Sequence, residues 1–460
     1  MDRVDVAVVG GGPAGTSAAR AAAAAGAETV VVEKGVPRED RDGPGPDSTD
    51  AAGLLDYWLD IMELDPEELP DGVVLRELDR AEFIGPTERV TIRETGLPAS
   101  YPKFGLTYDR ARFDDWLVER ARDAGADYRV GAGVRTVETA VSGGHPRHRV
   151  ALQDGDELDA EYLVLADGPQ RTVTMDVLDR HLPAGKRASD VLAPPRANHI
   201  AYQEYRRFPA GELETDAIKF WWGYLPGHTA YPWVFPNDGD VARVGLTMPI
   251  GLDLDDVPNR EAYGLLRPDD DRMPPGRELI RRLLEQEYGD DYDVEADFPL
   301  VEDRGKQAGT ETYPISSTRP VDSPVEANVA VTGGAMGATS AFHEGGGHVA
   351  VRTGAIAGEL AARGELDRYN TAWRAAIGDE VRRNAALAAV VRGFEPADWD
   401  RVFAIARRLV ELGPAGGVTL RKGLRAAGPA GLRLAARYKW QKLRLRGGRL
   451  AQIREADYRY

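Results

Sequence analysis

A histidine and a glutamate stand side by side in a glycine-rich segment in the last third of the chain. The segment reads VTGGAMGATSAFHEGGGH and ends at His348, and the pair is His343 and Glu344. Histidine has the side chain whose ordinary pKa lies closest to neutrality, and either group can give or take a proton beside a reacting centre. The alternative is that the pair caps a helix beginning near Gly347 or bridges to a bound cofactor. We expect His343 and Glu344 to be catalytic.

Aromatic residues crowd a second segment, KFWWGYLPGHTAYPWVFP, in the middle of the chain. Alternate side chains of a strand share a face, so Tyr231, Trp233 and Phe235 would form one wall. Such a wall suits an extended hydrocarbon, although a plain sheet core packed against a helix explains the same pattern. The expected substrate-binding residues are Trp221, Trp222, Tyr231, Trp233 and Phe235.

The N-terminal segment VDVAVVGGGPAGTSAARAAAAAGAETVVVEK predicts a strand, a tight turn, a helix and a second strand. Gly10, Gly12 and Gly15 fit G-x-G-x-x-G, whose glycines permit the turn, the approach of a pyrophosphate and close packing of helix on strand. Glu33 ends the second strand, at the spacing from Gly10 where an acid accepts hydrogen bonds from an adenosine ribose. The pattern predicts a dinucleotide site but does not separate FAD from NAD.

The composition restricts the class of protein. The chain has 460 residues, a net charge of -17 and no cysteine, which excludes disulfides, thiolate-bound zinc, iron–sulfur clusters and a cysteine nucleophile. The acidic excess argues against nucleic-acid binding. No uncharged apolar run is long enough to span a membrane and no secretory signal is visible, so we expect a cytoplasmic protein.

Three stretches follow the N-terminal motif in a set order. They are YDRARFDDWLVERARDAGADYRVGAGV, YLVLADGPQRTV and the glycine-rich segment already described. In order and spacing they resemble the FAD-dependent reductases and monooxygenases of the p-hydroxybenzoate hydroxylase type. Within that group, TAYPWVFPNDGDVARVGLTMP resembles the Y-x-W-x-F-P segment of the geranylgeranyl reductase family, which includes digeranylgeranylglycerophospholipid reductases.

The resemblance implies FAD as the cofactor and assigns its contacts. Arg110 would lie near the phosphates or the ring, although a solvated helix face is its alternative role. Val134 would contact the adenine end, and the Asp167-Gly168 loop would lie under the pyrophosphate. The expected FAD-binding residues are Gly10, Gly12, Ala14, Gly15, Glu33, Lys34, Asp50, Ala51, Gly53, Arg110, Val134, Asp167, Gly168, Gly334, Gly346 and Gly347.

Two positions depart from the family pattern. The family has an aspartate in a G-D-A-A-G segment where this chain has Gly334, although the amide of Gly334 can still donate. Several members have a cysteine near the positions occupied here by Asp50, Ala51 and Gly53, so a thiol mechanism is excluded. The glycines themselves let a flat ring lie on bare backbone, and helix-terminal N–H groups stabilise negative charge on a reduced flavin.

The resemblance implies a mixed α/β fold. A Rossmann-like FAD-binding domain would be interleaved with an antiparallel-sheet substrate domain and followed by a helical C-terminal region. The expected boundaries are 1–75, 105–174 and 320–365 for the FAD-binding domain, 76–104 and 175–319 for the substrate domain, and 366–460 for the C-terminal region.

The implied function is an FAD-dependent reductase that saturates isoprenoid (geranylgeranyl) double bonds of membrane-lipid precursors, by hydride transfer from the flavin and protonation. Reduced nicotinamide or an electron-carrier protein would supply the electrons. An FAD-dependent monooxygenase and a quinone-linked dehydrogenase are alternatives. The non-enzymatic alternative is a prenyl-lipid carrier with the same fold. No metal site is expected, because the seven histidines show no ligand spacing.

The C-terminal part of the chain is basic. From Leu412 to Arg454 it holds eleven Lys or Arg and no Asp or Glu, which leaves -28 on the remainder. Leucines, Tyr438 and Trp440 are interleaved with these cations. The segment either docks onto the acidic body of the protein or binds peripherally to the anionic inner face of the membrane.

Overall fold

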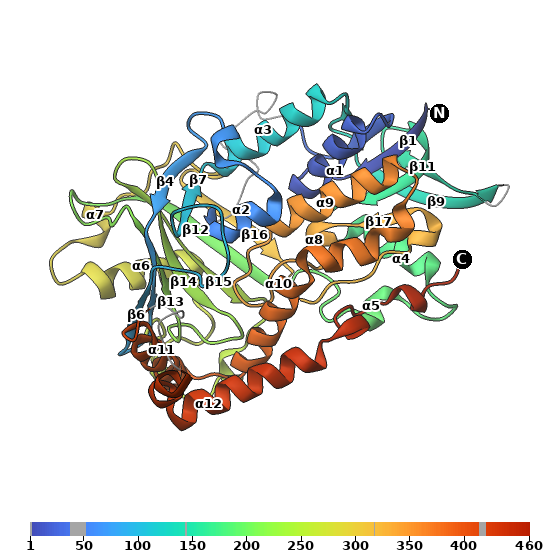
Figure 1. Cartoon of the computed structure of the whole chain (residues 1–460). Coiled ribbons are helices and arrows are strands. Elements are labelled where there is room, and N and C mark those ends of the chain that lie inside the picture. Colours follow the sequence, from blue (N-terminus) through green and yellow to red (C-terminus); the bar gives the residue numbers. More distant parts are fainter. Residues whose placement is uncertain (1, 37–51, 143–144, 317, 414–419) are drawn as a thin grey trace.

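The computed structural model describes residues 2–36, 52–142, 145–316, 318–413 and 420–460 (Figure 1). Two of the expected FAD contacts, Asp50 and Ala51, lie outside the described residues. Three sheets and the helices around them make up the fold. The prediction of a mixed α/β fold with a helical C-terminal region is confirmed.

The first sheet contains the N-terminal nucleotide motif. Its order is β8-β2-β1-β11-β10-β9, with β17 paired to β11. Val8 of β1 lies between Val31 of β2 and Val164 of β11, in parallel pairing, and all three side chains are fully buried. The strands are β1 (Asp2–Val9), β2 (Thr29–Val32), β8 (Asp127–Arg129), β9 (Val134–Ser142), β10 (His145–Leu152), β11 (Glu157–Leu165) and β17 (Val329–Val331).

Two helices lie against each other on this sheet, α1 (Pro13–Ala24) and α9 (Gly347–Ala362), as Figure 1 shows. Their backbones approach so closely that a Cβ on Gly354 would lie 1.9 Å from the carbonyl oxygen of Ala14. A Cβ on Gly358 would meet the carbonyl oxygen of Ala18 at the same distance. The two glycines of α9 therefore fix the glycine-rich segment against the N-terminal motif.

The second sheet has the order β16-β12-β15-β14-β13-β5-β6. One face packs on α6 (Gly276–Tyr288), and the other packs in part on α11 (Pro396–Val410). The strands are β5 (Arg80–Ile84), β6 (Arg89–Ile92), β12 (His199–Arg207), β13 (Ala217–Trp221), β14 (Tyr231–Pro236), β15 (Val241–Pro249) and β16 (Thr310–Ile315).

A three-stranded sheet, ordered β3-β7-β4, completes the strands. It comprises β3 (Gly53–Leu55), β4 (Val74–Leu78) and β7 (Gly105–Tyr108). The other α-helices are α2 (Asp56–Met62), α3 (Arg110–Asp123), α4 (Thr172–His181), α5 (Ala188–Val191), α7 (Val294–Asp297), α8 (Gly333–Met336), α10 (Tyr369–Val391) and α12 (Leu420–Arg444). The short 3-10 helices span Pro66–Glu68, Leu254–Asp256, Arg260–Ala262, Val325–Ala327, Leu366–Arg368, Gly447–Arg449 and Glu455–Asp457. Among the described helices, none combines the length and apolarity that a bilayer crossing requires.

The expected domain boundaries can be compared with the positions of these elements. Strands β5 and β6, from the expected segment 76–104, lie in one sheet with the strands of 175–319. Val177 and Leu178 of α4, by contrast, are buried in the core of the first sheet although their numbers fall in the expected substrate domain. The boundaries remain a prediction.

Candidate active site

Two glycines of the N-terminal turn are required by close backbone packing, whereas the third has free space around it. Gly10 has a φ of +101°, and a Cβ there would lie 2.4 Å from the carbonyl oxygen of Ala166. A Cβ on Gly15 would lie 1.9 Å from the carbonyl oxygen of Gly10. A Cβ on Gly12 would meet nothing within 4 Å, and Gly12 lines a cavity at the N-terminus of α1. Open backbone at a helix N-terminus fits a pyrophosphate.

Glu33 closes this turn from the end of β2. Its carboxylate accepts a hydrogen bond from the Gly11 N–H at 2.6 Å and another from the Gly35 N–H at 2.7 Å. Lys34 is exposed next to it. Val134 is half-buried at the start of β9, two residues after Ala132, whose N–H donates to the carbonyl oxygen of Glu33. The expected contacts of the adenosine thus lie near one another at one edge of the parallel strands.

Replacing Glu33 by alanine is expected to weaken FAD binding by about 1.5 to 3 kcal/mol, the loss typical of hydrogen bonds to a charged group. The effect combines a lost ribose partner with a loosened turn, because Gly11 and Gly35 lose their acceptor. Fluorescence titration of apoprotein with FAD measures it, and Glu28→Ala on the exposed turn before β2 is the control. Unchanged affinity in Glu33→Ala would remove Glu33 from the FAD site.

The Asp167-Gly168 loop presents backbone, and not its carboxylate, to the cavity. One oxygen of Asp167 accepts hydrogen bonds from the N–H groups of Val173 and Thr174 at 2.6 and 3.0 Å, so the side chain caps α4. Gly168 has a φ of +75° and lines the cavity. A Cβ on Gly334 would lie 3.3 Å from the ring of Pro169, so glycine at this departure from the family lets α8 approach the loop.

Arg110 also lines the cavity, at the start of α3. Its guanidinium donates a hydrogen bond from Nε to Asp114 at 2.7 Å, an ion pair along the helix. The guanidinium thus belongs to a residue that lines the cavity where the resemblance expects FAD. Its role as an FAD contact stays a prediction.

The cavity has a volume of about 670 Å³ and runs from the glycine turn to the aromatic segment. Ligand sites typically range from roughly 300 to 1,000 Å³. The expected FAD-binding residues that line it are Gly12, Ala14, Gly53, Arg110, Gly168, Gly334, Gly346 and Gly347. Gly10, Gly15, Glu33, Lys34, Val134 and Asp167 do not line it; the first two support the turn, as described above. Six of the eight lining residues are glycine, so this part of the cavity, called the FAD cradle below, offers backbone to a bound FAD.

The aromatic segment lines the other part of this cavity. Trp222, Tyr231, Trp233 and Phe235 face it, and the rings of Trp222 and Tyr231 stack at 4.3 Å. A Cβ on Gly245 would lie 2.5 Å from the Trp233 ring. The glycine at this position of β15 is therefore needed to make room for the indole. Further wall residues, absent from the sequence-based set, include Phe83, Ile218, Phe220 and Phe342.

Trp221 is a correction to the expected substrate-binding set. It is buried on the opposite face of the second sheet, in the core with α6, and its indole N–H donates to Glu287 at 3.0 Å. Neighbouring residues at the end of a strand point to opposite faces, so Trp221 and Trp222 cannot both face the cavity.

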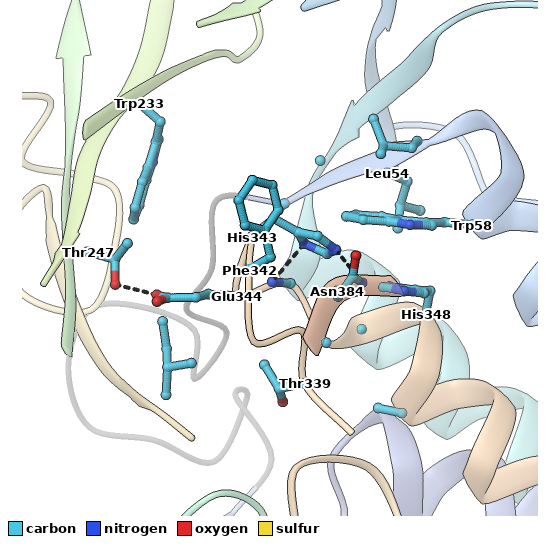
Figure 2. A pocket seen from close by; sticks show the side chains of 18 of the residues that line it. Leu54, Trp58, Trp233, Thr247, Thr339, Phe342, His343, Glu344, His348 and Asn384 are labelled. Atoms are coloured by element: carbon cyan, nitrogen blue, oxygen red, sulfur yellow. Dashed lines mark hydrogen bonds between the residues drawn. The ribbon is translucent and has the colours of Figure 1, made fainter. Parts of the chain in front are cut away.

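Figure 2 shows that His343 and Glu344 point in opposite directions within the cavity. Glu344 has a φ of +60° and turns toward the second sheet, where its side chain is almost completely buried. The Thr229 hydroxyl lies 2.8 Å from Oε1, the Thr247 hydroxyl is bonded to Oε2, and His199 Nε2 is 3.4 Å from Oε1. Burial raises the pKa of Glu344 to about 8, against the lowering effect of the two hydroxyls.

His343 turns toward α2 and α10 (Figure 2). Its Nδ1 accepts a hydrogen bond from the Gly345 N–H at 3.2 Å, its Nε2 lies 3.2 Å from the Asn384 amide nitrogen, and its ring packs on Trp58 at 4.9 Å. Burial, with Arg383 nearby, lowers the pKa of His343 to about 4. His343 is therefore a neutral imidazole at pH 7.

Apart from His348 at the end of the glycine-rich segment, the sequence does not single out the other polar residues of the site. His348 stacks on Trp58 at 4.1 Å, and neither ring nitrogen has a hydrogen-bond partner among the described residues. The buried Glu380 accepts a hydrogen bond from Asn384 at 2.8 Å and pairs with Arg383. These groups come from α2, α9 and α10, which no local spacing relates.

Several known proteins are similar to this chain. A family model described as "FAD binding domain" matches residues 5–59. The chain is 30% identical to the digeranylgeranylglycerophospholipid reductase of Thermoplasma volcanium, over 56% of this chain and 59% of that relative, so it spans little more than half the relative's length. It is 26% identical to the menaquinone reductase of Mycolicibacterium smegmatis, over 94% of this chain and 89% of that one.

A solved structure of a geranylgeranyl bacteriochlorophyll reductase-like protein from Thermoplasma acidophilum has the same fold. Its TM-score is 0.67 at 20% identity, over 96% of this chain and all of that one. Fold and cradle together define a flavoprotein with the FAD-binding architecture predicted from the sequence. The predicted resemblance is confirmed: the chain is similar in sequence to digeranylgeranylglycerophospholipid reductases and in fold to a geranylgeranyl bacteriochlorophyll reductase-like protein, and FAD is its cofactor.

Proposed function

We propose that the protein is an FAD-dependent reductase that saturates isoprenoid double bonds in a membrane-lipid precursor. The observation that supports this most is that one cavity joins the FAD cradle, a wall of aromatic rings and a buried carboxyl group with a raised pKa. Both relatives are named for lipids, which supports the substrate class.

The FAD cradle would hold reduced FAD, whose chemistry would be hydride donation to one carbon of the double bond. The other carbon needs a proton, and the donor must hold one at the working pH. Glu344, with a pKa of about 8, holds a proton at pH 7, whereas His343, with a pKa of about 4, is not in its acid form. We therefore assign the proton donor to Glu344 in preference to His343.

The hydrogen bonds around Glu344 accommodate a neutral carboxyl group. The Thr229 hydroxyl has one hydrogen and lies close to two oxygens, the carbonyl of His228 at 2.7 Å and Glu344 Oε1 at 2.8 Å. His199 Nε2 also lies 2.7 Å from the carbonyl oxygen of His228, so this carbonyl has a donor even when the Thr229 hydroxyl donates to Glu344. A protonated Glu344 donates from Oε1 to Thr229, which donates in turn to the carbonyl, while Thr247 donates to Oε2.

The aromatic wall positions the hydrocarbon and keeps water from the reacting carbons. Trp222, Tyr231, Trp233 and Phe235 offer ring faces and edges without a charge. The Tyr231 hydroxyl donates to the carbonyl oxygen of His343 at 2.6 Å, so it is occupied within the protein. The wall is thereby suited to a long apolar chain and poorly suited to a small polar aromatic substrate.

The electron donor is reduced nicotinamide or an electron-carrier protein. A monooxygenase would use the same cradle but consume O2, a quinone-linked dehydrogenase would pass electrons to the quinone ring, and a prenyl-lipid carrier would bind lipid without turnover. These outcomes separate in one experiment that has an anaerobic arm and an arm supplied with O2.

The test uses purified protein with FAD reduced by dithionite under argon. Addition of geranylgeranyl-chain glycerophospholipid is expected to reoxidise the flavin, with recovery of its yellow absorption band and a product heavier by two hydrogens per bond reduced. Menaquinone is the second substrate, and mass spectrometry distinguishes a saturated tail from a reduced ring. Lipid binding without reoxidation would favour the carrier, and reoxidation by O2 with oxygenated product would favour the monooxygenase.

A further inference from the structure

The last helix of the chain has an exposed apolar stripe. Helix α12 is broken at Gly428, where φ is +60°, and its second part, residues 429–444, is called the tail helix here. The helix packs against α10 and α11 along the outer edge of the molecule (Figure 1), and Arg437 donates to the carbonyl oxygen of Val390 at 3.1 Å. Leu434, on the inward side, is half-buried.

The opposite side of the tail helix carries large apolar side chains in solvent. Leu432, Trp440 and Leu443 are 45%, 59% and 47% exposed. Spacings of eight and three residues bring these three onto one helical face, with the exposed Ala436 between them. A contiguous exposed apolar stripe of this kind marks an interaction surface.

Basic side chains border the stripe. Arg433 and Arg444 lie on one side of it and Lys439 on the other. None of these three has a carboxylate ion-pair partner among the residues that the structure describes. The tail helix is therefore not held to the acidic body by charge.

We propose that the tail helix docks on the surface of an anionic lipid bilayer. A tryptophan and leucines flanked by unpaired cations match an interfacial helix, which lies in the headgroup region with its apolar side down. The remaining -28 charges are repelled by such a surface, so this edge of the molecule is the one that approaches. A second copy of the chain is the competing occupant, since its acidic body would also attract the cations.

The proposed surface lies close to the cavity wall. Helix α11 packs against α12 and, through Trp399, contacts the Trp222 ring of the cavity wall at 4.4 Å between centroids. A bilayer-docked tail helix would thus bring the apolar part of the cavity near its lipid. Docking does not depend on the proposed reaction, since it is measured without turnover.

The experiment is co-sedimentation of FAD-loaded full-length protein with vesicles of phosphatidylcholine that contain phosphatidylglycerol as the minor, anionic component. The wild type is expected to sediment and to be released by high salt. Arg433→Gln/Arg444→Gln should bind about 30-fold more weakly, from about 1 kcal/mol for each charge. Trp440→Ala/Leu443→Ala should lose tenfold or more, and pure phosphatidylcholine should bind weakly.

Val141→Ser is the matched control, because Val141 is an exposed residue on β9 of the first sheet. It should bind as the wild type does. Sedimentation velocity without vesicles tests the competing occupant. Three results would each overturn the proposal. They are a wild type that never sediments with vesicles, double variants that bind vesicles as the wild type does, and a wild-type dimer that both double variants abolish. An unchanged flavin spectrum in every variant would show that a loss of vesicle binding is not caused by unfolding.

Discussion

Glu344→Gln is expected to slow saturation of the isoprenoid double bond by about 10²-fold or more while FAD stays bound. The amide fills the same space and keeps an acceptor toward Thr247, but it has no acidic proton to give. Single-turnover reoxidation of reduced flavin by the lipid under argon measures the step, and the flavin spectrum reports on cofactor binding.

The pH dependence has a definite sign. An acid donor acts in its protonated form, so the wild-type rate should be level below a pH of about 8 and fall as pH rises through the raised pKa of Glu344. In Glu344→Gln this decline should disappear. His343→Gln is the comparison variant: if it loses the rate and the decline above pH 8 while Glu344→Gln keeps both, the proton comes through His343 and our assignment is wrong.

Gly354→Ala is expected to destabilise the protein by about 3 kcal/mol or more, at the upper end of the cost of overpacking. The new methyl carbon would lie 1.9 Å from the carbonyl oxygen of Ala14, and backbone cannot turn aside as a side chain can. Separation of α9 from α1 would displace both helix starts that line the cavity. Urea denaturation and FAD retention on gel filtration measure the two consequences.

Gly378→Ala on α10 is the matched control for this substitution. Gly378 is also a buried helical glycine, but its nearest contact is an ordinary 3.7 Å to the Cβ of Arg374. Alanine there should be neutral or stabilising by up to about 1 kcal/mol, since alanine is the better helix former. Equal stability of the two variants would mean that α1 and α9 separate at no cost.

The nucleotide-binding part could be predicted because it is local. Strand, turn, helix and Glu33 follow one another in a single short segment at the start of the chain, and each is recognisable by a short period or a glycine. The alternation of Tyr231, Trp233 and Phe235 predicted their common face by the same logic. Applied to the adjacent Trp221 and Trp222, that rule would have removed one of the two from the expected set.

The rest of the site depends on contacts that no local pattern encodes. The partners of Glu344 are Thr229, two residues before β14, and Thr247 of β15, both far earlier in the chain. The opposite directions of His343 and Glu344 follow from a positive φ at a non-glycine residue, which the sequence does not announce. The pKa of each group depends on this burial, so the sequence could name the pair but not divide its roles.

The pairing of distant strands also determines when the protein can fold during synthesis. The first sheet needs β17 at residue 331 and is covered by α9 up to residue 362, while the second sheet joins β5 at residue 80 to β16 at residue 315. A nascent chain shorter than this holds two unfinished sheets with open edges, which are prone to pair with other chains. The ribosome must therefore release most of the sequence before either sheet is complete, and a chaperone that covers strand edges would act on this protein late in translation.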